Sequence, residues 1–281
     1  MLNGRLQVYY RQELKLGILG KTKIFYGNFQ MHDKRILITG ASKGLGAVAA
    51  HAFAERGARL ALIARSEDKL EQVRQSCEDP EQHVSIPVNL LEMDAIKPAI
   101  QRVQAFLGGI DVVLHAAGGG LGLKNDFLKH GDFMKLFALN LGAAAEINRL
   151  VAPAMKERRS GNLVHVGSIA SSEGVGSVGY NTVKAALAAY VRSLGRELNR
   201  NNVIATGILP GGFISPGNAM SRLQEFNPAA YKAFIDERLP RKIMGDAEEL
   251  IPMLVLLCSE DASMMGGCLV PIDAGEGRAY I

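Results

Sequence analysis

The chain of 281 residues is predicted to have an α/β fold, a doubly wound parallel sheet of about seven strands with helices on both faces. Two observations predict this fold. Short apolar runs alternate with longer helical stretches along the sequence, and a glycine-rich turn follows the first run and opens a helix. The alternation is continuous and contains no low-complexity linker, which favours a single domain.

Seven apolar runs predict the strands, because each is short, rich in β-branched residues and separated from the next by a helical stretch. The runs are Ile36–Thr39, Leu60–Ala64, Val84–Val88, Val112–His115, Leu163–Val166, Val203–Ile208 and Leu269–Ile272. In such a sheet, ligands bind at the carboxyl ends of the strands. Thr39, His115, Ser168 and Pro210 all fall at strand ends, so we expect one cleft to collect them.

The first strand leads into a glycine-rich turn and then into an alanine-rich helical segment. Gly40 and Gly44 permit the turn, and Gly46 lets the helix approach the strand closely. The free N–H groups and positive dipole of the helix N-terminus suit a pyrophosphate. The order of strand, turn and helix therefore predicts a dinucleotide site formed by Gly40, Ser42, Lys43, Gly44, Leu45 and Gly46.

The end of the second strand bears on the choice of cofactor. A carboxylate there would bind the free ribose hydroxyls of NAD and repel the 2′-phosphate of NADP. This strand ends in Ala64-Arg65-Ser66, with no acid before Glu67. Arg65 and Lys43 can pair with a 2′-phosphate, so NADP(H) is the expected cofactor. Two solvated surface cations are the alternative interpretation.

The segment Tyr180-Asn181-Thr182-Val183-Lys184 places a phenol and an ammonium one helical turn apart. A nearby ammonium favours the ionised phenol, so the pKa of Tyr180 is expected to be lowered toward a range where it exchanges a proton. Tyr180 is therefore a candidate general acid/base. Similar pairs also occur on solvated helix faces, so the interpretation depends on the other motifs.

Together these motifs resemble the short-chain dehydrogenase/reductase family, in its single-domain Rossmann-type form, from Ile36 to Asp273. The family pattern T-G-x-x-x-G-x-G matches Thr39 to Gly46, and Y-x-x-x-K matches Tyr180 and Lys184. The resemblance implies a catalytic set of Asn140, Ser168, Tyr180 and Lys184, and no metal. It also adds to the predicted cofactor site Asn89, Leu90, Ala117, Gly118, Tyr180, Lys184, Pro210, Gly211, Phe213 and Ser215.

The resemblance and the chemistry jointly imply an NADP(H)-dependent oxidoreductase that transfers a hydride between nicotinamide and a carbonyl or secondary alcohol. Tyr180 would be the acid/base, with its pKa lowered by Lys184, which also holds the nicotinamide ribose. Ser168 would donate a hydrogen bond to the substrate oxygen, and Asn140 would fix a water that replenishes the proton. A non-catalytic NADP(H)-binding sensor or partner subunit is the alternative.

Three positions depart from the family pattern. His115 stands where relatives usually have an asparagine, and we expect it to be a structural histidine with satisfied hydrogen bonds. Asn89 replaces an aspartate that often contacts the adenine amine, and its side-chain carbonyl can still accept that bond. Ser168 precedes Tyr180 by twelve positions, one fewer than the commonest spacing.

Residues 211–245 are the least regular part of the sequence. Such an insertion beside the cofactor turn indicates either a substrate lid or a surface helix pair with a partly buried aromatic face. The substrate is left open between a 3-oxoacyl thioester, a sugar, a steroid and another cyclic alcohol. Relatives imply a homodimer or homotetramer, and the alanine-rich stretch Ala185–Ala189 would permit close helix approach.

Residues 1–30 form an N-terminal extension that we expect to be dispensable or absent from the native protein, so that the domain comprises residues 31–281. The extension carries five basic residues and one acidic residue, which accounts for the whole net charge of +4. The neutral remainder argues against a nucleic-acid partner. No apolar run approaches the ~18 residues typical of a membrane helix. Three scattered cysteines favour a reducing, cytoplasmic location.

Overall fold

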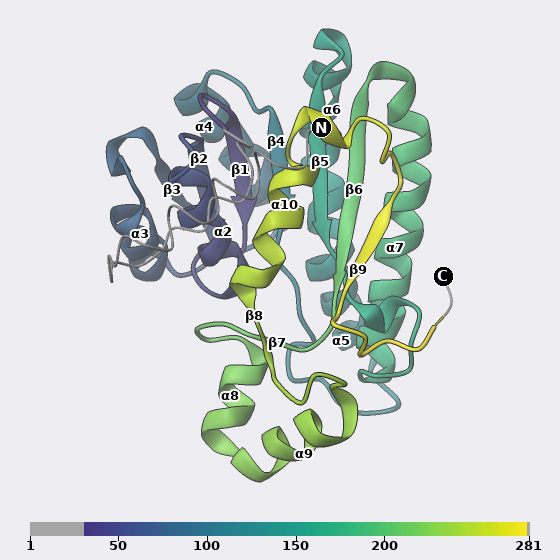
Figure 1. Ribbon diagram of the computed structural model, residues 1–281. Coiled ribbons are helices and arrows are strands. Elements are labelled where there is room, and N and C mark those ends of the chain that lie inside the picture. The colour runs from purple at the N-terminus through teal and green to yellow at the C-terminus, as the bar shows by residue number, and fades with distance from the viewer. Residues whose placement is uncertain (1–30, 280–281) are drawn as a thin grey trace, which may run out of the picture.

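The computed structural model describes residues 31–279, and the predicted extension at residues 1–30 lies outside the described residues. A parallel sheet of seven strands forms its centre (Figure 1). All seven predicted runs are strands, and the predicted fold class is confirmed. Their order across the sheet is β3 (Val84–Pro87), β2 (Arg59–Ala64), β1 (Arg35–Thr39), β4 (Val112–His115), β5 (Gly161–Val166), β6 (Val203–Pro210) and β9 (Leu269–Ile272).

The central strands are buried on both faces, because helices cover both sides of the sheet. Every residue of β4 and of β6 is buried. One core cluster joins β1 through Ile36 and Ile38 to the helix that follows the glycine turn, and a second lies under Leu37 on the opposite face. Burial on both faces explains why these strands read as continuous apolar runs.

The helices form two layers (Figure 1). The layer that belongs to the first core cluster contains α2 (Gly44–Ala54), α3 (Glu67–Ser76) and α10 (Ile251–Leu257). The layer on the other face contains α4 (Met93–Leu107), α6 (Ala143–Arg158) and the long α7 (Val178–Leu198). The short α5 (His130–Phe137) packs against α7.

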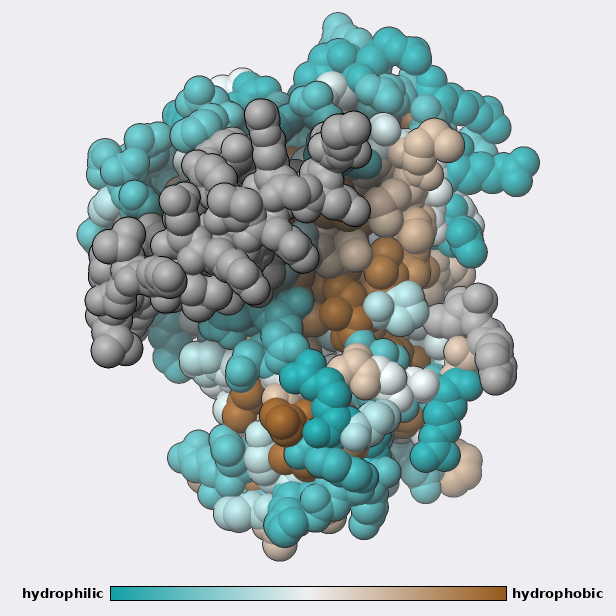
Figure 2. Space-filling view, in the orientation of Figure 1, coloured by the Kyte–Doolittle hydropathy of each residue, from teal (hydrophilic) through white to brown (hydrophobic). Residues whose placement is uncertain are grey.

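The insertion after β6 projects from the carboxyl ends of the strands, at the bottom of Figure 1. Two short parallel strands, β7 (Phe213–Ile214) and β8 (Gly245–Asp246), tie its two ends together. Between them lie α8 (Ala219–Phe226) and α9 (Pro228–Arg238), neither of which buries a residue. In Figure 2 brown side chains of this projection lie on the side toward the body of the molecule, and its lower rim is mostly hydrophilic.

Within residues 31–279, no helix combines the length and the apolar character needed to cross a lipid bilayer.

Candidate functional site

The glycine turn between β1 and α2 has the geometry that its sequence requires. Gly40 and Gly44 have positive φ angles of 70° and 61°, in the region that favours glycine. A Cβ on Gly46 would lie 2.5 Å from the carbonyl oxygen of Gly40, so only glycine permits this approach of helix and turn. Ser42 and Lys43 complete the turn, and the N-terminus of α2 faces the cleft at the strand ends.

The segment that follows β7 packs directly on this turn. The N–H of Gly44 donates to the carbonyl of Pro216 at 3.1 Å. Ser215 is buried, and its hydroxyl is one of two buried side-chain oxygens without a hydrogen-bond partner in the described part of the chain. An unpartnered buried hydroxyl is costly unless a ligand completes it. The glycine turn and Ser215 therefore fit the pyrophosphate of a dinucleotide.

Two predicted cations lie at the neighbouring strand end. Lys43 in the turn and Arg65 after β2 are both exposed. Partial burial lowers the pKa of Lys43, and the positive charges of Arg222, Lys69 and Arg65 lower it further. Arg222 and Lys69 were not singled out in the sequence, because nothing in their local pattern connects them to the turn.

Asn89 and Leu90 follow β3. The side-chain carbonyl of Asn89 accepts from the N–H of Leu91 at 3.2 Å, and its amide donates to Glu92 at 2.9 Å. The carbonyl expected to face the adenine is thus already engaged in a local turn. Leu90 is buried and lines a small cavity beneath the site.

Ser168, Tyr180 and Lys184 come together at the carboxyl end of β5. Ser168 follows the strand, and Tyr180 and Lys184 lie one turn apart on α7. The hydroxyl of Ser168 is close enough to the phenol of Tyr180 to lower its pKa. The ammonium of Lys184 lies 5.7 Å from the centre of the Tyr180 ring and donates to the carbonyl of Val166 at 2.9 Å. Hydroxyl, phenol and ammonium therefore share one site.

The expected direction of the Tyr180 pKa shift is wrong for the structure. Burial raises the pKa of Tyr180, and the neighbouring Ser168 hydroxyl only partly opposes that rise. Burial also lowers the pKa of Lys184, to about 8, because the side chain is only 3% exposed. Desolvation disfavours the charged form of both groups.

Asn140 completes the predicted catalytic set from a π-helical turn, Ala138–Gly142, between α5 and α6. Its side chain accepts from the N–H of Gly119 and donates to the carbonyls of Gly119 and Leu136, each at 3.0 Å. A Cβ on Gly118 would lie 2.9 Å from the Asn140 amide oxygen and 3.4 Å from the Lys184 ammonium. Asn140 thus fixes the loop after β4 beside Lys184.

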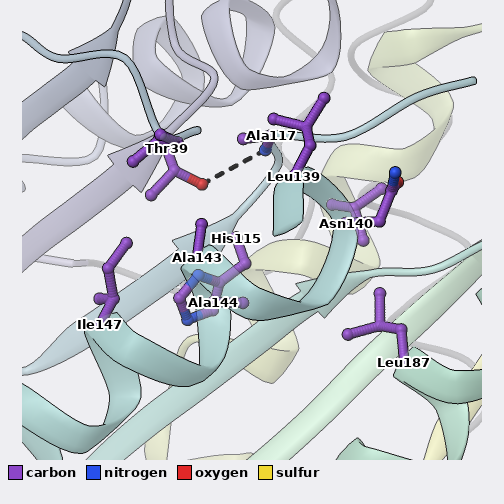
Figure 3. A pocket seen from close by; sticks show the side chains of 11 residues that line it. Thr39, His115, Ala117, Leu139, Asn140, Ala143, Ala144, Ile147 and Leu187 are labelled. Carbon is purple, nitrogen blue, oxygen red and sulfur yellow. Dashed lines mark hydrogen bonds between the residues drawn. The ribbon is translucent and has the colours of Figure 1, made fainter. Parts of the chain in front are cut away.

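A small cavity lies below this loop (Figure 3). Its lining comes from β1, β4, α6 and α7, through residues that include Thr39, His115, Ala143 and Leu187. The Thr39 hydroxyl accepts from the N–H of Ala117 at 3.3 Å, which joins the ends of β1 and β4. This bond holds the adjoining strand ends together beside the cavity.

His115 belongs to a buried polar network, as expected for a structural histidine. Its Nε2 donates to the carbonyl oxygen of Asn148 at 2.8 Å, and the Asn148 amide contacts His165 Nε2 and the Tyr190 hydroxyl, each at 3.1 Å. His165 Nδ1 donates to the carbonyl of Thr206 at 3.0 Å. The two imidazole rings stack at 4.6 Å. Burial lowers the pKa of His115 well below its usual value, and that of His165 to about 4.

The predicted residues Pro210, Gly211 and Phe213 lie in and beside the turn after β6. A residue that the sequence did not reveal contacts this turn. Glu276 is buried, and its carboxylate accepts from the N–H of Gly212 at 2.5 Å and from the guanidinium of Arg238 at the end of α9. Only the fold brings Glu276 to this turn, so no local signal could have identified it.

The loop between Ser168 and α7 is tied to the end of the described chain. The carboxylate of Glu173 accepts from the N–H groups of Arg278 and Ala279, the latter at 2.9 Å. Asp273 stabilises the same tail by accepting from the N–H groups of Gly275 at 3.0 Å and Gly277 at 2.9 Å. The tail therefore lies beside the loop that follows Ser168.

Comparison with known proteins decides the family. The sequence profile described as "short chain dehydrogenase" matches residues 34–225, more than half of the chain. The chain belongs to the short-chain dehydrogenase family. In the part of this short-chain dehydrogenase that the structure describes, no cluster of three or more side chains suited to a metal ion is found.

Several individual relatives resemble this short-chain dehydrogenase along most of its length. It is 28% identical over 260 residues to 3-oxoacyl-(acyl-carrier-protein) reductase MabA of Mycobacterium avium, a match that covers 91% of this chain and 94% of the relative. The structure of L-sorbose reductase from Gluconobacter frateurii, complexed with NADPH and L-sorbose, has a TM-score of 0.80 at 25% identity and covers 90% of this chain and 100% of its own. NADPH-dependent 3-quinuclidinone reductase from Rhodotorula rubra has a TM-score of 0.76 at 28% identity, with 88% and 92% covered.

Short-chain dehydrogenases are oxidoreductases that bind a nicotinamide cofactor, and this membership fits the glycine turn and the group formed by Ser168, Tyr180 and Lys184. The relatives act on chemically different molecules according to their names, from an acyl carrier protein thioester to a sugar. Family membership therefore establishes oxidoreductase activity as the class of function and leaves the substrate open.

Proposed function

We propose that the chain is an NADP(H)-dependent oxidoreductase that interconverts a carbonyl compound and a secondary alcohol, with Tyr180 as the acid/base. One observation carries the proposal: the Ser168 hydroxyl lies close enough to the Tyr180 phenol to lower its pKa, while the Lys184 ammonium lies beside the same ring. A protein that only bound the cofactor would have no need of a phenol placed beside both a hydroxyl and an ammonium. When bound, the nicotinamide supplies or accepts the hydride.

In the reduction direction, the substrate oxygen gains negative charge and needs a proton. Burial keeps the Tyr180 phenol protonated at neutral pH, so it is ready to act as the general acid. Ser168 donates a hydrogen bond to the same oxygen where that charge develops. Lys184, still mostly protonated at pH 7 with a pKa of about 8, stabilises the tyrosinate that remains.

In the oxidation direction, Tyr180 must accept a proton, and its raised pKa then opposes the ionised form that is required. The positive charge of the oxidised nicotinamide offsets part of that effect. Lys184 also holds the nicotinamide ribose, and Asn140 orders the loop and a water beside Lys184. The relay of the proton to solvent through that water is part of the proposal.

Replacement of Tyr180 by phenylalanine tests the acid/base role. Tyr180→Phe should lower kcat by a factor on the order of 10² to 10⁴, because the general acid is lost, while the Kd for NADPH changes little. Tyr190→Phe is the matched control, since it removes a half-buried phenol from the same helix outside the site. Substantial turnover by Tyr180→Phe would refute the role.

The preference for NADP(H) rests on Lys43 and Arg65 beside the glycine turn. Arg65→Asp places a carboxylate where it would repel a 2′-phosphate and accept from free ribose hydroxyls. We expect the ratio of kcat/KM for NADPH to that for NADH to fall at least tenfold. An unchanged ratio would show that Arg65 does not face the cofactor.

The alternative of a non-catalytic NADP(H)-binding sensor or partner subunit makes a different prediction. It requires NADPH binding without turnover of any carbonyl compound in a broad screen followed by NADPH absorbance. Such a screen, including acyl thioesters, sugars and cyclic ketones, also identifies the substrate class. The insertion with α8 and α9 is proposed to act as the substrate lid.

A homodimer or homotetramer is proposed on the basis of α7. Ala185 and Ala189 are exposed one turn apart on this helix, which leaves a strip of small side chains for close helix approach. Light scattering after size-exclusion chromatography measures the mass directly, and a single species near 30 kDa would contradict the proposal. A cytoplasmic location remains a prediction from the few, scattered cysteines.

A further inference from the structure

Four cations gather beside the glycine turn, and each comes from a different element. Lys43 belongs to the turn, Arg65 follows β2, Lys69 lies in α3 and Arg222 lies in α8 of the insertion. None of the four forms an ion pair with another residue between 31 and 279. Other cations of the same insertion do form such pairs, namely Lys232 with Asp236, Arg238 with Glu276 and Arg241 with Glu249.

Arg222 is held in this group by direct contacts. Its guanidinium donates to the carbonyl of Gly217 at 2.6 Å. A Cβ on Gly217 would lie 3.3 Å from the side chain of Lys43, so the two segments are in contact. Asn218 caps α8 by accepting from Ser221 at 2.8 Å and anchors it by donating to the carbonyl of Phe213 at 2.8 Å. These contacts therefore fix the first turn of α8 beside Lys43 of the glycine turn.

The four charges repel one another in the absence of an anion. The pKa of Lys43 is lowered by its burial and then, in order, by Arg222, Lys69 and Arg65, so Arg222 affects it more than Arg65 does. A phosphate ester carries close to two negative charges near neutral pH and accepts several charge-assisted hydrogen bonds. Bound at this position, it would turn the repulsion between the insertion and the turn into attraction.

We infer that Arg222 is a specificity-determining residue for the 2′-phosphate of NADP(H), and that this phosphate holds helix α8 against the glycine turn. The inference rests on the proposed function and deepens it. The phosphate would be bound by the cofactor domain through Lys43 and Arg65 and by the insertion through Arg222. NADPH would therefore order the insertion more strongly than NADH does.

The test uses two small probes with the full-length protein, 2′,5′-ADP and 5′-AMP, which differ only in the 2′-phosphate. Isothermal titration calorimetry gives both dissociation constants. Arg222→Gln should weaken binding of 2′,5′-ADP about tenfold, since a hydrogen bond to a charged group is lost, and leave binding of 5′-AMP unchanged. Lys232→Gln, which alters an exposed, paired cation of the neighbouring helix, should change neither constant.

Hydrogen exchange of residues 219–226 tests the second half of the inference. In the wild-type protein, 2′,5′-ADP should slow exchange of these amides more than 5′-AMP does, and Arg222→Gln should abolish the difference. Arg222→Lys keeps the charge but loses the planar fork, so it should retain part of the preference for 2′,5′-ADP. This second variant keeps the test decisive if the glutamine variant fails to fold.

The outcomes separate this inference from the proposed function. Equal affinity of the wild-type protein for both probes would overturn the NADP(H) assignment itself. A wild-type preference for 2′,5′-ADP that survives in Arg222→Gln would overturn the role of Arg222 and leave the assignment standing. Equal weakening of both probes would also overturn it, because the lost contact would then not involve the 2′-phosphate. Unchanged protection of α8 in Arg222→Gln would overturn the ordering of the insertion.

Discussion

The pKa of the Lys184 ammonium lies only a little above neutral pH. The ammonium is buried, donates one hydrogen bond to a carbonyl and has no acidic partner within residues 31–279. Its pKa of about 8 means that the charge persists at pH 7 but only narrowly. A buried cation in this state gains from any new acceptor, such as a ribose hydroxyl or a tyrosinate, which fits its proposed role.

The buried histidine pair predicts a loss of stability in mild acid. His165 has a pKa of about 4 in the folded protein, against about 6.5 when unfolded, and that of His115 is also strongly lowered. Their contribution to stability is complete above pH 6.5 and is lost as the pH falls toward 4, because the unfolded chain then binds more protons. Each histidine contributes a slope of at most about 1.4 kcal/mol per pH unit.

Urea unfolding at pH 7.5, 6 and 5 measures this effect. His115→Asn retains a partner for Asn148 and should make the free energy of unfolding less dependent on pH over this range. His130→Asn alters an exposed histidine and serves as the control. If His115→Asn and the wild-type protein lose stability in parallel, the pair does not account for the acid sensitivity.

At the scale of elements, the insertion is a pair of helices, α8 and α9, that a small number of contacts attach to the rest of the molecule. The two-residue strands β7 and β8 join its ends, and α9 is attached through Arg238 and the buried Glu276. Phe234 of α9 lies against the same turn, since a Cβ on Gly212 would come within 2.7 Å of its ring. Few contacts hold the insertion, so changing one of them should alter its mobility without unfolding the sheet.

Glu276→Gln tests this attachment. The amide keeps one acceptor oxygen, so either the Gly212 N–H or the Arg238 guanidinium loses its partner. We expect amide exchange in residues 228–238 to accelerate about tenfold and the free energy of unfolding to fall by roughly 1–3 kcal/mol. Asp236→Asn removes only an exposed ion pair and should cost less than about 1 kcal/mol. Identical exchange in the two variants would contradict the attachment.

The elements that sequence could predict are those buried on both faces. The seven apolar runs are strands because helices cover both sides of the sheet, and the glycine turn could be read from its spacing. The choice between lid and surface helices for residues 211–245 could not be made, since α8 and α9 bury no residue in the fold.

Other features of the site depend on contacts that are distant in sequence. The network around His115 needs Asn148 from α6 and Tyr190 from α7, and Glu276 reaches its partners only in the folded chain. The direction of the Tyr180 pKa was mispredicted because spacing reveals a neighbouring charge but not the depth of burial. Local patterns thus predict which groups meet, whereas their energetics require the fold.

For the molecule as a whole, Met31 marks where the described domain begins. Its side chain is 2% exposed and belongs to the first core cluster, and its N–H donates to the carbonyl of Arg56 at 3.0 Å. Lys34 donates back to the Met31 carbonyl at 3.0 Å. Met31 therefore contributes to the core, although it stands before the first strand.

A chain shortened to begin at Met31 should fold with a Tm close to that of the full chain and bind NADPH with the same Kd. An α-amino group at Met31 can still donate to Arg56, so this contact is kept in the shortened chain. Met31→Ala in the full chain should instead cost about 2–5 kcal/mol, through lost burial and a cavity. Calorimetry of both proteins checks this, and a large loss of Tm on shortening would show that residues 1–30 are needed.

The fixed position of Arg278 and Ala279 beside Glu173 has a practical consequence. Glu173 lies in the loop that joins Ser168 to α7, so residues 278 and 279 lie beside the loop that follows the proposed catalytic serine. A purification tag or fluorescent reporter attached to the carboxyl end would begin close to that loop and could disturb the hydrogen bonds to Glu173. Assays that search for the substrate should therefore be run with an untagged carboxyl end.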